Sequence, residues 1–427
     1  MNYKEMAKVF IISFLIIGIN EIILFLVTAL ISHQLSQSDF GDFQSFVAGM
    51  RFFGALATFG FLAFMAKYIP VLKHHLRKKE WTEVKAFYVK IIFPTVAIIL
   101  MLLTLTFLCL YFIFKKDQFN HPFLLMCFVI LLESFFLVAF TLLKSKSKYI
   151  ASTTLYAVKH IAFLILILLF KNSSQSVYIP VICYLLAYVI TLVYFVILKL
   201  VILKLEYFQK TFNFNISPVK WKLLVFPFAL LAISPYLFSS LVMIVFEVFG
   251  SGSEDLVGRL GALIALFSLS LIAIFPLKTF TVNELAKVVD EPDKVISMVK
   301  SLFIFGLSAC LVLFVLFNLF SGILISAMAS EYHDLVSYFR VLLILLILIG
   351  MTSPFSSCLK VSNNVHFAII FIILTTMLAI TILGAIFSYF YQLEGMIFAI
   401  FLSYFIYMGL NIYFFWRVHL QKLSTLT

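Results

Sequence analysis

The sequence predicts an all-α membrane protein whose helices cross a lipid bilayer twelve times. Its composition supports this fold class, since 64% of the 427 residues are hydrophobic and only 12% are charged. A soluble domain carries about 25% charged residues, so this chain has too few polar groups to cover a water-facing surface. A spanning helix needs about 20 apolar residues, and the length accommodates twelve such helices with short connections.

Apolar runs bounded by charged residues, Asn, Gly or Pro mark the individual spans. The first run is longer than the hydrophobic region of a signal peptide, so we expect it to be retained as a span. The predicted spans are 8–31, 42–66, 86–113, 121–143, 149–170, 177–199, 222–249, 257–279, 299–326, 336–358, 365–390 and 395–417.

The positive charges predict the direction of these spans. Most of the 31 Lys and Arg residues fall at the N-terminus, in alternate connections and at the C-terminus. Cytoplasmic connections carry the Lys and Arg excess in membrane proteins, so both termini are expected in the cytoplasm. Adding or removing one helix would destroy this alternation, and the charge pattern therefore supports the number of spans as well.

A weak internal repeat predicts two six-helix lobes around a central cavity. Asp39-Phe40-Gly41 opens the second span, and Asp255-Leu256-Val257-Gly258 opens the eighth, about half a chain length later. Transporters built from such repeats place the substrate site between the halves. We expect an N-terminal lobe at 1–205, a cytoplasmic connector at 206–221 and a C-terminal lobe at 222–427.

Four basic residues within the predicted spans are candidate substrate-binding groups. A charge in the bilayer interior costs from about 2.5 to above 10 kcal/mol, so intramembrane charges are functional candidates. Arg51 lies too deep to reach either membrane surface, and Lys159 is expected to point inward in preference to its neighbour His160. Arg259 and Arg340 lie nearer a span end, where they could also extend to the headgroups. Guanidinium groups match phosphate oxygens, so these cations indicate an anionic ligand.

Three acidic residues within the spans, Glu21, Glu133 and Glu247, are candidate coupling sites or counter-ions. An ion pair of Arg51 with Glu21 on the neighbouring span is the structural alternative for Arg51. Pro227 and Pro235 lie in the seventh span, where each removes a backbone donor and allows the helix to bend.

Several activities lack their sequence motifs. No phosphate-binding loop of the G-x-x-x-x-G-K-[ST] type occurs, and the five cysteines have no ligand spacing. We expect no enzyme activity, no metal site and no cofactor. The net charge of +12 arises from membrane-flanking lysines, so no nucleic acid is expected as a partner.

Three stretches of the chain resemble the Wzx-type polysaccharide (O-antigen) flippases of the multidrug/oligosaccharidyl-lipid/polysaccharide exporter superfamily. Leu35 to Pro70 runs from an acidic-Phe-Gly turn to a basic-Tyr-Ile end. Gly258 to Lys287 has the Gly-rich start of the family's eighth span, and Leu393 to Arg417 is similar to its Gly-led final span.

The resemblance implies flipping of a polyprenyl-pyrophosphate-linked oligosaccharide by alternating access, for cell-surface polysaccharide biosynthesis. It implies the bacterial cytoplasmic (inner) membrane as the location. The implied partners are the lipid-linked oligosaccharide, membrane lipids, a polysaccharide polymerase and glycosyltransferases. Arg51 and Arg259 match the family's cavity cations best by position, and Lys159 matches less well. A cation-coupled multidrug or small-solute antiporter of the same superfamily and a non-transporting membrane assembly partner are the alternatives.

Overall fold

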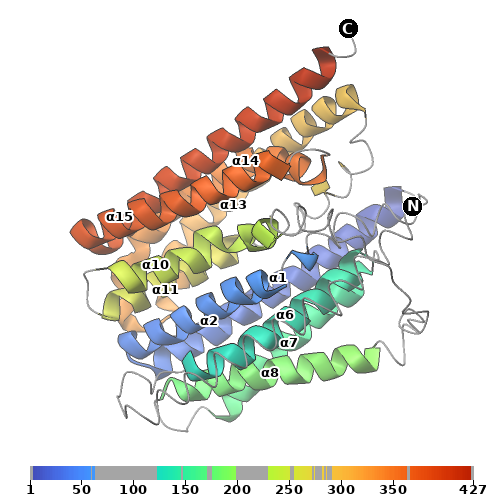
Figure 1. Cartoon of the computed structure of the whole chain (residues 1–427). Coiled ribbons are helices and arrows are strands. Elements are labelled where there is room, and N and C mark those ends of the chain that lie inside the picture. Colours follow the sequence, from blue (N-terminus) through green and yellow to red (C-terminus); the bar gives the residue numbers. More distant parts are fainter. Residues whose placement is uncertain are drawn as a thin grey trace, which may run out of the picture. The chain divides into compact units, whose positions relative to one another are not determined.

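A computed structural model describes residues 3–62, 123–198 and 229–424, apart from short gaps at 59, 146–147, 171–175, 251–253, 272–273, 275–280, 283–284, 286–290 and 363–365. Within these residues the chain is helical and contains no strand (Figure 1). The predicted connector, 206–221, and the third predicted span, 86–113, lie outside them.

The chain separates into two compact units, whose boundaries fall inside α2 (Gln37–Ala57) and between Tyr236 and Leu237. Unit 1 is Met1–Ser45 with Leu237–Thr427, and unit 2 is Phe46–Tyr236. These units differ in extent from the lobes predicted at 1–205 and 222–427, and the predicted lobes stay a prediction. The further helices are α1 (Tyr3–Gln34), α6 (Phe123–Ser145), α7 (Tyr149–Leu169), α8 (Tyr178–Ile197), α10 (Val242–Phe249), α11 (Glu254–Ser270), α13 (Pro292–Ser326), α14 (Val336–Val361) and α15 (His366–Ser424).

Helices are found at eleven of the twelve predicted spans, and the remaining span is the one outside the described residues. Seven segments of the described chain are long and apolar enough to cross a membrane. The last two predicted spans form α15, which is interrupted at Gln392 with a φ of 49°. The all-α multispan fold predicted from composition is therefore confirmed.

The predicted seventh span is irregular at Pro235. A short 3-10 helix, Ser234–Tyr236, is followed at once by a π-helical turn, Leu237–Leu241, before α10 begins. Proline removes a backbone donor and disturbs the preceding turn, which accounts for the change of helix type. Pro227, the other proline of the predicted bend, lies outside the described residues.

The two segments that carry the internal repeat lie against each other in unit 1. Asp39 stands in the first turn of α2, where its backbone N–H donates to the Ser36 hydroxyl over 3.1 Å. Asp255 likewise stands in the first turn of α11, and acidic groups are favourable at a helix N-terminus. Gly258 faces the Gln37 carbonyl so closely that a Cβ there would collide with it. Glycine thus allows the starts of α2 and α11 to meet.

Helices α13, α14 and α15 pack side by side in unit 1 (Figure 1). Their contact surface includes Val299 from α13, Cys358 from α14 and Phe415 from α15, all buried. Large apolar side chains cover the outside of α13, among them Val312, with 59% of its surface exposed, and Leu319, with 73%. Such a surface suits contact with lipid chains, in agreement with a membrane protein.

Candidate functional site

Helices α6, α7 and α8 pack together in unit 2 (Figure 1), and they carry the buried ionisable residues Glu133, Lys159 and His160. Each helix contributes residues spaced three or four apart, which places them on one helix face. We call these side chains, with Arg51 of α2, the core cluster: Arg51, Glu133, Phe136, Tyr156, Lys159, Tyr184 and Tyr188.

Lys159 sits among aromatic rings of all three helices and is only 2% exposed. Its Nζ lies 4.5 Å from the ring centre of Phe136, 4.8 Å from Tyr188, 5.0 Å from Tyr156 and 5.9 Å from Tyr184. The ammonium donates a hydrogen bond to the Tyr188 hydroxyl over 3.2 Å, and that hydroxyl donates to Tyr184 over 3.4 Å. Cation–π attraction and one hydroxyl therefore replace part of the lost hydration of the charge.

Arg51 and Glu133 belong to the same electrostatic group. The Arg51 guanidinium lies within electrostatic range of the Glu133 carboxylate and of Tyr156, Tyr184 and Tyr188. Arg51 remains partly exposed, whereas Glu133 is 2% exposed. Because two members are cations and one is a carboxylate, the core cluster has an excess positive charge.

A close helix contact positions these two charges. The Ser134 hydroxyl donates to the Gly54 carbonyl over 3.0 Å, which ties α6 to α2. A Cβ at Gly54 would stand 2.5 Å from the Glu133 Cγ, so only glycine permits this approach. Arg51 stands one turn before Gly54 on α2, and the contact therefore brings it to the Glu133 side chain.

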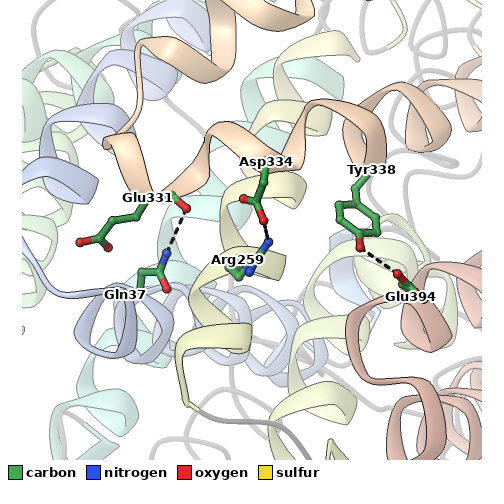
Figure 2. A network of polar contacts seen from close by, with 6 residues as sticks. All are labelled: Gln37, Arg259, Glu331, Asp334, Tyr338 and Glu394. Atoms are coloured by element: carbon green, nitrogen blue, oxygen red, sulfur yellow. Dashed lines mark hydrogen bonds and ion pairs between the residues drawn. The ribbon is translucent and has the colours of Figure 1, made fainter.

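Unit 1 holds a second polar group, the rim network, which joins the segment Ser330–Leu335 and the start of α14 to other helices (Figure 2). The Arg259 guanidinium donates to the Asp334 carboxylate in an ion pair, and the Gln37 amide donates to the Glu331 carbonyl over 3.3 Å. The Tyr338 hydroxyl donates to the Glu394 carboxylate over 2.9 Å. The rim network therefore consists of Gln37, Arg259, Glu331, Asp334, Tyr338 and Glu394.

The other predicted site residues, which are Glu21, Glu247, Arg259 and Arg340, belong to unit 1. Arg340 is exposed, and its Nε donates to the Ser321 hydroxyl over 2.9 Å. Glu21 is buried at 4% exposure in α1, and Glu247 is partly exposed in α10. The predicted pair of Arg51 and Glu21 stays a prediction, because the two residues belong to different units.

Three of the seven predicted residues, Arg51, Glu133 and Lys159, meet in one place within unit 2. Within that same part of the chain, no group of three His, Cys, Asp or Glu side chains is arranged to hold a metal ion. His160 is fully buried, and its ring lies 4.8 Å from that of Tyr156.

The aromatic members of the core cluster were not predicted from the sequence, because the charged residues alone do not indicate them. Tyr156 stands three residues before Lys159, and Tyr184 and Tyr188 stand four apart on the next helix. This spacing puts each pair on one helix face, which is the signal that could have revealed them. Tyrosine is common in apolar helices, however, so the spacing gains meaning only once a buried cation is known to lie beside it.

Comparisons with solved structures show which fold these helices form. A MATE transporter in the straight conformation superposes with a TM-score of 0.70 at 13% identity, covering 98% of this chain and 96% of that chain. The outward-facing conformation of a multidrug resistance MATE family transporter of the MOP superfamily gives 0.67 at 14% identity, covering 98% and 97%. A MOP superfamily transporter from Pyrococcus furiosus Vc1 (DSM3638), for which reverse polarity of the binding pocket suggests a different function, gives 0.65 at 14% identity, covering 96% and 95%.

No model of a protein family matches the sequence, and no curated protein is similar enough to count as a relative. The structural likeness extends over nearly the whole of both chains at low identity. The chain therefore has the fold of the MATE transporters of the MOP superfamily.

Proposed function

We propose that this protein is a membrane transporter that flips a polyprenyl-pyrophosphate-linked oligosaccharide across the bacterial cytoplasmic membrane. The observation that carries the proposal is the excess positive charge of the core cluster, placed on apolar helices. A pyrophosphate group carries negative charge and several acceptor oxygens, which suit a guanidinium and an ammonium. The MATE-like fold supports a transport role, and the resemblance to polysaccharide flippases supports the choice of substrate.

Within this proposal, Arg51 contacts the pyrophosphate and Lys159 contributes to the positive field around it. Arg51 is the only one of the two cations that keeps appreciable exposed surface, and its fork of donors can bind two oxygens at once. Lys159 is enclosed by rings, so its charge acts on the ligand from behind them. The polyprenyl tail stays in lipid, which matches its apolar chemistry.

The pair of Arg259 and Asp334 makes Arg259 a weaker candidate for phosphate binding than its sequence position suggests. Its charge is balanced by a carboxylate, and 57% of the Asp334 side chain is exposed. Arg259 as a substrate-binding residue remains a proposal, as does Arg340. We assign both a minor share of the binding.

A flipping assay in a bacterial strain that lacks its own translocase tests the proposal. Expression of the wild-type chain is expected to restore surface polysaccharide, Arg51→Ala is expected to abolish this, and Arg259→Ala is expected to keep most of it. Membrane insertion is checked by quantifying the full-length protein in isolated membranes. If normally inserted Arg51→Ala restores polysaccharide as well as wild type, the cation mechanism is wrong.

Glu133 supports the second candidate function, a cation-coupled multidrug antiporter. It is 2% exposed, and its Oε2 atom has no hydrogen-bond partner among the described residues. A buried carboxylate oxygen without a hydrogen-bond partner is suited to contact a cationic ligand. The antiporter function predicts that the wild-type chain exports organic cations and that the Glu133→Gln variant does not. The flippase function predicts no such export by the wild-type chain.

Fusing a periplasm-selective and a cytoplasm-selective reporter enzyme to the C-terminus tests the proposed topology. Both termini are proposed to face the cytoplasm, so only the cytoplasm-selective reporter is expected to be active. A polysaccharide polymerase and glycosyltransferases are the proposed protein partners, and cross-linking in a strain that makes the polysaccharide would detect them.

A further inference from the structure

The environment of Lys159 has the chemistry of a binding site for an organic cation. Four aromatic rings from three helices surround one ammonium group, with ring centres at 4.5 to 5.9 Å. Cages of aromatic rings at such distances recognise alkylated ammonium ligands in other settings. In this protein the cation that fills the cage is one of its own side chains.

The contacts of Lys159 differ from those of an ordinary buried lysine. Buried charges are usually paired with an opposite charge, yet the hydrogen bond that the ammonium makes within the described residues goes to a neutral hydroxyl, that of Tyr188. The cage walls pack against one another. Phe136 contacts Tyr188 edge-on at 5.6 Å, and Tyr184 contacts Tyr188 edge-on at 5.1 Å. The rings therefore support one another through their own contacts, and the Lys159 ammonium lies between them.

We infer that Lys159 is a specificity-determining residue, a tethered cation that occupies an aromatic cage and thereby keeps organic cations out of it. The ligand class of the emptied cage is a small alkylammonium ion. The consequence for transport rests on the proposed function: with Lys159 in place, the core cluster presents positive charge and selects anions. Without Lys159, the same rings and the Glu133 carboxylate offer a cation-binding site.

The side-chain atoms that Lys159→Ala removes indicate which ligand fits the emptied cage. Replacing Lys159 with alanine removes three methylene groups and the ammonium, which together correspond to a propylammonium ion. Propylammonium carries its charge at neutral pH, and its neutral form crosses membranes, so it reaches a buried site. 1-Propanol has a similar size without the charge, which makes it the matched control ligand.

The test measures binding of propylammonium to the purified full-length protein in detergent, by the rise in Tm and by calorimetric titration. Lys159→Ala is expected to bind propylammonium at least about tenfold more tightly than wild type does and at least about tenfold more tightly than it binds 1-propanol. Lys159→Met, which refills the space with a neutral side chain, is the matched control variant and is expected to bind neither ligand. Equal propylammonium binding by Lys159→Ala and wild type overturns the inference.

A second measurement covers the case in which Lys159→Ala folds poorly. Cells that express this variant are grown with and without propylammonium, and the folded, detergent-extractable protein is compared. The inference predicts a higher folded yield with propylammonium and no gain with 1-propanol, and the absence of any gain overturns it. Neither measurement involves transport, so failure here leaves the flipping result with Arg51→Ala standing, and failure of that assay leaves the cage result standing.

Discussion

The core cluster and the rim network contain the same kinds of charged group but surround them differently. In the core cluster, Glu133 and Lys159 are each 2% exposed and lie among aromatic rings. In the rim network, the side chains of Arg259 and Asp334 are 24% and 57% exposed. Water screens the charges of the exposed Arg259–Asp334 pair strongly, and it screens the buried charges of Glu133 and Lys159 much less. The contrast teaches that burial, more than residue type, separates a candidate binding group from a surface ion pair.

The first way to sharpen this comparison is to replace, with alanine, the glycines that allow the helices of each region to approach closely. Gly258→Ala should cost about 3 kcal/mol or more of unfolding free energy, because the new methyl group meets the rigid Gln37 backbone. Gly54→Ala should cost about 1–3 kcal/mol, because the new methyl group meets the Cγ and Cβ of Glu133 and forces that side chain to shift.

Denaturant unfolding in detergent measures both changes, with Gly322→Ala as control. A Cβ at Gly322 meets nothing within 4 Å, so alanine there should leave stability unchanged or raise it by about 1 kcal/mol. A Gly258→Ala variant as stable as Gly322→Ala would show that α2 and α11 do not meet at this point.

The second way is to neutralise the acid of the core cluster. Glu133→Gln should lower the unfolding free energy by about 2–3 kcal/mol, because it removes the carboxylate that lies near the Arg51 guanidinium in a largely buried setting. The effect should persist at high salt, since mobile ions do not reach the buried group. Unfolding at low and high ionic strength measures this, and a loss that vanishes in high salt would mean that Glu133 is open to solvent.

The third and smallest effect comes from the corresponding change in the rim network. Asp334→Asn should lower stability by about 0.2–1 kcal/mol, the range of exposed ion pairs. In about 1 M salt, where the screening length is about 3 Å, the difference from wild type should disappear. A double-mutant cycle with Arg259→Ala isolates the pair, and a coupling as large as that of Glu133 would remove the distinction between the two regions.

The sequence predicts the helices far better than it predicts the site. Apolar runs and alternating Lys and Arg positions mark the spans, because the bilayer demands a fixed length of apolar helix. The break at Pro235 is also predicted, since proline removes a donor wherever it stands. These features depend on local chemistry, which one sequence contains.

The site depends on which helix faces meet, and a single sequence does not contain that information. The resemblance places Arg51 and Arg259 together as cavity cations, and the pairing of Arg259 with Asp334, 75 residues away, makes them different. Lys159 was identified as an inward-facing cation, but its cage required α6 and α8 to lie beside α7. Contacts between distant segments decide these differences.

The most direct test of the pyrophosphate-binding role is the affinity of purified protein for a polyprenyl pyrophosphate, compared between wild type, Arg51→Ala and Arg259→Ala. Losing a charge-assisted contact of about 2 kcal/mol weakens binding about 30-fold, and this is the loss expected for Arg51→Ala. Arg259→Ala should change the affinity by less than about threefold, because its charge is already paired. If Arg51→Ala binds the lipid pyrophosphate as tightly as wild type, the core cluster is not the pyrophosphate site.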